Sequence, residues 1–295
     1  MATKRKAAKK SNSVRKASAK VLGRRAVSIA TNSEKTVKQR VAAAAGTSLA
    51  MIENDRDFQA MLQVLRNKEE PIEVRMAALQ SLGAAAFSVV AFESCRADYI
   101  ATLREVATDP NEQLRTRVLG ILMRNKDGFA QKKLLEGLKN PDKALISPEK
   151  ALQLLSYDVH AEAYSVARDI VKKPPNDLAR REAIRLLAAD AKSAPLFEKL
   201  LRDKKELREI RQISASALQS LRPERLQENA RKILLDKSDY SDIKATSLTA
   251  LEQFGDDAAL GKDKALLQSV NRLKNSKISA KYKQTARRFL TKYSP

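Results

Sequence analysis

The chain contains the stretch Pro71-Ile-Glu-Val-Arg-Met-Ala-Ala-Leu-Gln-Ser-Leu-Gly83, whose core is the frame Ala-Leu-x-x-Leu-Gly. An apolar residue returns in the same frame at intervals of 40, 33, 32, 34 and 33 residues. These anchor residues are Leu79, Leu119, Leu152, Ile184, Leu218 and Leu251. A weaker seventh unit ends near Phe289. Self-similarity at such a period is the sequence signature of a repeat architecture.

Each anchor segment is preceded by a second amphipathic segment. In the first of these, Phe58, Met61 and Leu65 recur three and four residues apart, which places them on one face of a helix. The seven preceding segments span residues 58–66, 99–107, 129–138, 163–171, 196–201, 226–235 and 266–273. Breaks such as Asp109-Pro110 separate the paired segments, and proline suits the first turn of a helix. The repeating unit is therefore predicted to be helix, short turn, helix.

The composition also favours helices. Trp is absent, only 4% of the residues are aromatic, and the chain has 8 Gly and 9 Pro, whereas Ala, Leu, Lys, Arg and Glu are abundant. These residue types lose least on entering a helix. The apolar content of 43% is sufficient for a continuous core between stacked hairpins.

The repeat resembles HEAT repeats of the short bacterial type. The features that carry the resemblance are Glu73-Val-Arg75-Met-Ala77-Ala-Leu79 and Asp109-Pro110 followed by Arg115. Other units depart from it, because the position four residues before the anchor is occupied by Pro148, Ser214 and Ser247. No shared ligand therefore follows from the resemblance. Armadillo and tetratricopeptide repeats are the alternatives, although the tetratricopeptide pattern of Trp and Gly-x-x-Tyr is absent.

The resemblance implies an all-α, armadillo-type fold: a right-handed α-solenoid of about seven HEAT-like helical hairpins. We expect this solenoid to occupy residues 54–295 and to follow an N-terminal capping helix region at 34–53. Residues 1–33 are rich in Lys and Arg and contain almost nothing apolar to bury. We therefore expect them to form a disordered basic tail.

No constellation of catalytic residues is visible in the sequence. The chain has one histidine, His160, and one cysteine, Cys95, so a zinc site of clustered Cys and His ligands cannot be built. No nucleophile motif and no phosphate-binding glycine loop occurs. Cys95 lies beside Arg96 at a helix start, where a thiol can become reactive, but a structural role is the simpler interpretation. The sequence thus predicts a protein that is not an enzyme and uses neither cofactor nor metal.

Three enzyme groups share related scaffolds and can be compared with this chain. Deoxyhypusine hydroxylases need several His-Glu pairs for iron, and the HEAT-like DNA glycosylases use aromatic residues, Trp included. A single His and the absence of Trp argue against both. The bilin-attachment lyases of cyanobacteria share the short repeat type, and no residue set here singles them out.

The sequence also sets expectations about location. No stretch reaches the roughly 18 apolar residues that span a bilayer, and the N-terminus has no apolar core of a secretory signal. One cysteine cannot form a disulfide within the chain, which fits a reducing compartment. We expect a monomeric, cytoplasmic protein, with association with the nucleoid, or nuclear location in a eukaryote, as alternatives. A transit peptide at the N-terminus is a further alternative.

Positive charge is the main functional signal. The net charge is +22, and residues 1–45, with 13 Lys or Arg and one acid, carry +12 of it. Such a tail can neutralise phosphates and bind nucleic acid without sequence preference. It can equally be a targeting or solubilising segment. The candidate anion-binding residues of the tail are Lys4, Arg5, Lys6, Lys9, Lys10, Arg15, Lys16, Lys20, Arg24 and Arg25.

The repeat region adds cations on or near the anchor helices. Arg75, Arg115 and Arg180 lie four residues before an anchor, about 40° around the helix from it. We therefore expect them at the edge of the core, paired with acids such as Asp109 of neighbouring turns. The candidates for ligand contact on the concave face are Arg117, Arg181, Arg185, Arg208 and Arg211.

Two functional hypotheses follow. In the first, the basic tail and concave face bind an acidic macromolecule, DNA or RNA. In the second, the solenoid is a scaffold or adaptor for protein partners, an acidic protein among them, and the tail only targets or solubilises the chain.

Overall fold

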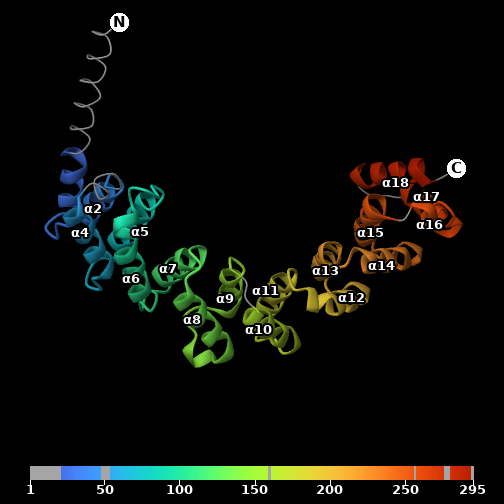
Figure 1. Cartoon of the computed structure of the whole chain (residues 1–295), viewed down its shortest axis with the longest axis horizontal. Coiled ribbons are helices and arrows are strands. Elements are labelled where there is room, and N and C mark those ends of the chain that lie inside the picture. The colour runs from blue at the N-terminus through green and yellow to red at the C-terminus, as the bar shows by residue number, and fades with distance from the viewer. Residues whose placement is uncertain (1–20, 48–53, 159–160, 256, 276–279, 294–295) are drawn as a thin grey trace, which may run out of the picture. The chain divides into compact units, whose positions relative to one another are not determined.

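The computed structural model describes residues 21–47, 54–158, 161–255, 257–275 and 280–293. Within these ranges all regular secondary structure is helical (Figure 1). The chain forms two compact units. The first ends at Ile146 and the second begins at Ser147. The all-α prediction is therefore confirmed for the described residues.

The first unit contains the opening hairpins of the repeat. Helix α4 packs against both α5 and α6, α6 packs against α7, and α7 packs against α8. Helix α2 packs against α5 and extends the stack toward the N-terminus. The helices are α2 (Val37–Ala44), α4 (Asp55–Arg66), α5 (Ile72–Ala85), α6 (Arg96–Val106), α7 (Glu112–Arg124) and α8 (Gly128–Lys139), with short 3-10 turns at Glu93–Cys95 and Pro141–Lys143.

The second unit continues the same alternation. Its helices are α9 (Pro148–Leu155), α10 (Ala161–Lys172), α11 (Asp177–Leu187), α12 (Ala194–Arg202), α13 (Arg208–Leu221), α14 (Pro223–Leu235), α15 (Ser241–Phe254), α16 (Asp257–Leu260), α17 (Lys264–Lys274) and α18 (Ala280–Tyr293), with a 3-10 turn at Ala191–Ser193. The paired helices α10 and α11, α12 and α13, α14 and α15, and α17 and α18 pack together as hairpins.

The hairpins of the second unit stack into two layers. One layer is continuous through contacts of α12 with α14 and of α14 with α17. The other runs through α9, α11, α13, α15 and α18, each in contact with the next (Figure 1). This arrangement is that of an α-solenoid, in which a repeat buries its apolar face only against its neighbours.

The anchor residues form the seam between the layers. All six, from Leu79 to Leu251, are buried, and Phe289 of the weaker last unit is fully buried as well. In the last hairpins Phe289 packs against Tyr293 with ring centroids 4.6 Å apart, in a cluster that includes Leu251 and Val270. Each fully buried side chain of this size contributes about 1.5–3 kcal/mol relative to an exposed one.

Polar caps set where several helices begin. Thr36 accepts a hydrogen bond from the Gln39 backbone N–H, and the Gln39 side chain accepts one from the Thr36 N–H in return. Asn111 caps α7 directly after the predicted Asp109-Pro110 break. Such caps satisfy backbone N–H groups that have no partner within the helix.

Part of the segment predicted to be a disordered tail is helical. Residues 21–30 form a helix, and the side chains of Val27 and Ala30 are buried. The Nε of Arg40 donates a 3.0 Å hydrogen bond to the Ala30 carbonyl oxygen and ties this helix to α2. Predicted disorder over residues 1–33 is therefore corrected for 21–30, because Val27 and Ala30 line one helix face while Arg24 and Arg25 stay exposed on another. Residues 1–20, with the tail cations from Lys4 to Lys20, lie outside the described residues.

Candidate functional site

Buried arginines connect successive repeats. The Nε of Arg211 donates to the carbonyl oxygen of Leu201, ten residues earlier, at 2.8 Å. Its two terminal nitrogens each donate at 2.7 Å to the carboxylate of Asp239, which belongs to the next repeat. Arg75 is held in the same way, by the Leu65 carbonyl at 3.0 Å and by the Asp109 carboxylate. One side chain thus joins its own hairpin to the hairpin that follows.

Three more arginines vary this arrangement. Arg40 pairs with Glu70 at 2.7 Å, and Arg180 makes two contacts with the Glu206 carboxylate, at 3.0 and 2.5 Å. Arg115 donates to the backbone carbonyl oxygens of Asp109, Pro110 and Leu145. The structural role predicted for Arg75 and Arg180, with pairing to an acid, is therefore confirmed. Arg115 is also held by the fold, but by carbonyl oxygens and not by the predicted acid.

Arg211 was a candidate ligand contact, and this prediction is wrong. Its side chain is 0% exposed, and its guanidinium is held by the Asp239 carboxylate and the Leu201 carbonyl oxygen. Arg211 lies seven residues before the anchor Leu218, which is only about 20° around the helix. It therefore points more directly into the core than the arginines at four residues before an anchor.

The other cations of the anchor helices are mostly neutralised across repeats. Arg185 contacts Glu182 and Glu209 at 2.7 Å each, and Arg181 contacts Glu209 at 3.4 Å. The Arg208 guanidinium pairs with Asp242 at 2.6 Å and lies over the ring of Tyr240. The structure therefore does not gather these side chains into a free cationic strip.

Among the predicted cations that the structure describes, Arg24, Arg25 and Arg117 are exposed, and no ion pair of theirs occurs within the described ranges. Arg24 and Arg25 lie on the 21–30 helix and Arg117 lies on α7. Their role in binding anions stays a prediction.

An apolar loop that the sequence analysis did not identify projects from the first unit. Residues 86–91 connect α5 to the 3-10 turn before α6, and we call them the apolar tip. Phe87 is 89% exposed, Val89 62% and Val90 92%. The tip lies between the anchors Leu79 and Leu119, whose 40-residue spacing is the longest in the repeat. That extra length was the sequence signal that could have located the tip.

The tip is held in a defined conformation at both ends. The Ser88 N–H donates to the Ala85 carbonyl at 3.0 Å, and the Phe92 N–H donates to the Ser88 carbonyl at 2.9 Å. The buried Phe92 ring packs edge-on against Phe58 and Tyr99, with centroids 5.7 and 5.5 Å away. Burial raises the pKa of Tyr99 to about 12 against the opposing charge of Arg124, so this ring stays neutral. The exposed side chains are thus presented on a fixed base.

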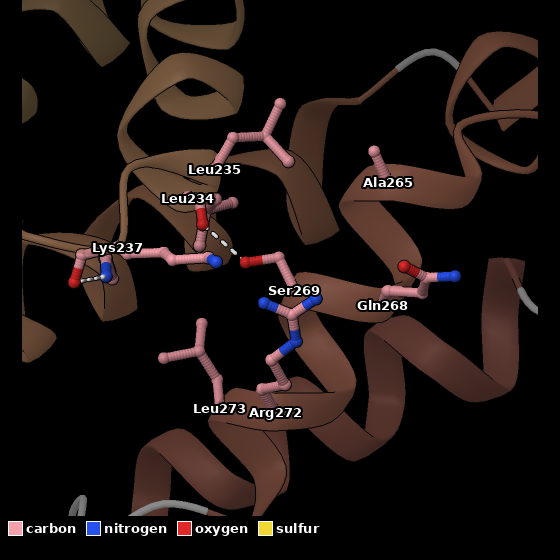
Figure 2. A pocket seen from close by; sticks show the side chains of 9 residues that line it. Leu234, Leu235, Lys237, Ala265, Gln268, Ser269, Arg272 and Leu273 are labelled. Carbon is pink, nitrogen blue, oxygen red and sulfur yellow. Dashed lines mark hydrogen bonds between the residues drawn. The ribbon is translucent and has the colours of Figure 1, made fainter.

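A basic pocket lies in the second unit, between the end of α14, the first turn of α15 and one side of α17 (Figure 2). Its volume is about 440 Å³ and its charged lining consists of Lys237, Lys244 and Arg272. A second cavity of about 470 Å³ lies between α11 and α13, where Arg185 and Glu209 line it together. The two cavities differ in that only the second includes a carboxylate.

The remaining candidate chemical groups lie apart from these surfaces or outside the described residues. Cys95 is buried beside Ser94, as its structural interpretation predicts, and His160 lies outside the described residues. Within the described residues, His, Cys, Asp and Glu side chains do not gather in groups that could hold a metal ion. Nor does any described helix have the length and apolar character that a membrane span requires.

Three comparisons with known proteins were made, and one of them found a similar protein. No protein-family model matches the sequence, and no curated protein matches it. Among solved structures, the complex of CpcE and CpcF of phycocyanin lyase from Nostoc sp. PCC7120 is similar, with a TM-score of 0.38 and 14% sequence identity. The match covers 85% of this chain and 92% of that chain. The HEAT assignment itself stays a prediction.

The prediction that the chain is not an enzyme is wrong by this comparison, because the similar complex is a lyase. One His and one Cys exclude only the chemistries that depend on those groups, so their scarcity did not justify the general statement.

The Asp109–Arg75 ion pair should make the stability of the fold depend on pH. Burial alone would raise the pKa of Asp109, but hydrogen bonds from Arg75 and the Asn111 N–H, with the charges of Arg75 and Lys68, lower it. The pair therefore stabilises the fold above the unfolded-state pKa of about 3.9 and loses this contribution as pH falls through the lowered folded-state pKa.

We expect Asp109→Asn to lose about 3–5 kcal/mol of unfolding free energy at pH 7, since Arg75 is left buried without its counter-charge. The difference from the wild type should narrow below about pH 4. Urea denaturation from pH 7 to pH 2 measures the loss of unfolding free energy and its dependence on pH. Asp142→Asn, at an exposed position, is the matched control. A difference that is absent at pH 7, or unchanged in acid, contradicts this role.

Proposed function

We propose that this chain is a helical-repeat binding protein that holds a protein partner through the apolar tip. The observation that carries the proposal is the exposure of Phe87 and Val90, at 89% and 92%, in a chain whose surface is otherwise highly charged. Clustered exposed apolar side chains mark interaction sites, and a large aromatic side chain is a common energetic centre of an interface.

The position of the tip supports this interpretation. It is an insertion between repeats, and insertions of this kind map to loops that are frequently binding surfaces. Its ends are fixed by hydrogen bonds and by the Phe92 ring, so little conformational entropy is lost when a partner covers Phe87.

The charge of the chain indicates the chemistry of the partner. A net charge of +22 attracts acidic surfaces and accelerates their encounter. We therefore propose an acidic protein, whose apolar contact is made with the tip and whose charge guides association.

Cross-linking tests the tip directly. A photo-reactive phenylalanine analogue at position 87 should capture a discrete protein in the cells that make this chain, because the side chain is covered in the complex. The same analogue at position 178, where Leu178 is 49% exposed on α11, is the matched control. The captured protein, once purified, should bind Phe87→Ser/Val90→Ser at least about tenfold more weakly than the wild type.

The proposal is contradicted if the analogue captures the protein equally at positions 87 and 178, or if Phe87→Ser/Val90→Ser binds that protein as tightly as the wild type. Capture of a second copy of the chain would replace the acidic partner with self-association.

A second candidate function is binding of nucleic acid by the tail, favoured by the +12 charge of residues 1–45. Eight of these cations, from Lys4 to Lys20, precede the first helix that the structure describes. Each phosphate that they neutralise would release counterions and make the affinity dependent on salt.

Titration with random-sequence duplex DNA tests this function. The full chain should bind at roughly 50 mM salt, and log affinity should fall with log salt by about 0.9 per phosphate contacted. Deletion of residues 1–20, which leaves the 21–30 helix in place, should reduce that slope. If neither form binds at low salt, the chain has no general affinity for DNA.

A further inference from the structure

We propose that the basic pocket of the second unit is a binding site for a phosphate monoester carried on a small apolar group. The site is independent of the apolar tip, which belongs to the first unit, and of the tail. Its recognition elements are Lys237, Lys244 and Arg272, above a floor of leucine side chains.

The pocket is assembled from three separate segments. Leu234 and Leu235 come from the end of α14, Lys237 and Lys244 from the turn and first helical turn that follow, and Arg272 from α17. In Figure 2 the Lys237 side chain extends into the pocket toward Ser269 and Arg272. The stacking of α14 against α17 therefore brings Arg272 together with Lys237, which lies 35 residues earlier in the sequence.

The pocket is ordered by its own hydrogen bonds. The Ser269 hydroxyl donates to the Leu234 carbonyl oxygen at 2.5 Å and joins α17 to the end of α14. The Lys244 ammonium donates to the Lys237 carbonyl oxygen at 3.3 Å, which holds that cation at the rim. Two sides of the pocket are thus fixed before a ligand arrives, and such preorganisation lowers the cost of binding.

The positive charge of the pocket is not balanced by the protein. Nearby carboxylates are committed elsewhere: Asp236 pairs with Lys204, Asp239 with Arg211, and Asp263 with Arg231. Among the residues that the structure describes, no carboxylate lines the pocket, and none of its three cations forms an ion pair. Cations gathered without a counter-charge repel one another, and a bound anion relieves that repulsion.

The second cavity shows what a balanced site looks like in this fold. It has a similar volume of about 470 Å³, but its Arg185 is neutralised by Glu182 and Glu209 at 2.7 Å each. An anion would have to displace these acids before it could bind there. The two cavities therefore differ in charge balance and not in size.

The chemistry of the lining points to phosphate. A guanidinium presents parallel N–H groups to two oxygens of one phosphate, and ammonium groups add point charges. Three cations match a dianion better than the single charge of a carboxylate. Leu234, Leu235 and Leu273 supply an apolar floor for the body of the ligand, and a volume of about 440 Å³ is suited to a small molecule.

Calorimetric titration of the full chain with phenyl phosphate tests the site. We expect saturable binding with one site, and weaker binding of inorganic phosphate, which cannot use the leucine floor. Lys237→Gln and Arg272→Gln should each lower the affinity for phenyl phosphate about tenfold, since each removes a charged hydrogen-bond donor. The matched controls are Lys232→Gln on α14 and Lys264→Gln on α17, exposed cations outside the pocket.

Two further arms complete the experiment. Binding of a phosphoserine peptide is compared with binding of free phenyl phosphate. If the peptide binds more tightly, the source of the phosphate monoester is a phosphorylated protein; if phenyl phosphate binds more tightly, it is a small molecule. Because Lys237 is exposed on a turn, Lys237→Gln should unfold at the wild-type urea midpoint. The proposal is overturned if the wild type shows no saturable binding, or if Lys232→Gln and Lys264→Gln weaken binding as much as the pocket variants.

Discussion

The buried arginine that joins one hairpin to the next is the interaction on which the rest of this structure depends. Taking a guanidinium out of water is costly, and the cost is offset only if its charge and its donors are all satisfied. Arg75 and Arg211 each offset part of this cost with a carbonyl oxygen of their own repeat and a carboxylate of the following one. The two hairpins are therefore held in a single register, because any slip would leave a buried charge without its partner.

This use of charge changes what a net charge of +22 means for function. Arg181, Arg185 and Arg208 form ion pairs between repeats and leave little free charge on the anchor helices. Positive charge that is not balanced occurs in particular places, such as the pocket around Arg272. Function in this chain is therefore expected where the repeat departs from its own pattern: at an inserted loop, and at a pocket whose acids are committed elsewhere.

The repeat was predictable from sequence because burial imposes it. An apolar anchor must return every 33 residues or so, and residues at −4 must lie near the core, so both the hairpins and the pairing of Arg75 with Asp109 could be foreseen. The prediction failed at Arg211 because position −7, like −4, faces the core. The 21–30 helix was missed because charge was weighed above the spacing of Val27 and Ala30.

The candidate sites were less accessible to sequence reasoning. The 40-residue interval marked an insertion, but not that Phe87 would be exposed while Phe92 was buried. The basic pocket depends on residues from α14, α15 and α17 that meet only when the hairpins stack, and on the pairing of Asp236, Asp239 and Asp263 with other cations. No local sequence pattern shows which of these carboxylates already forms an ion pair with another cation.

A double-mutant cycle between Arg211 and Asp239 tests the central claim most directly. Urea unfolding of Arg211→Met, Asp239→Leu and the double variant gives the coupling energy of the pair. We predict that each single change is strongly destabilising, that the double variant recovers most of the loss, and that the coupling approaches 3 kcal/mol. Additive effects, with a coupling below about 0.5 kcal/mol, would show that the buried arginines do not hold the repeats together.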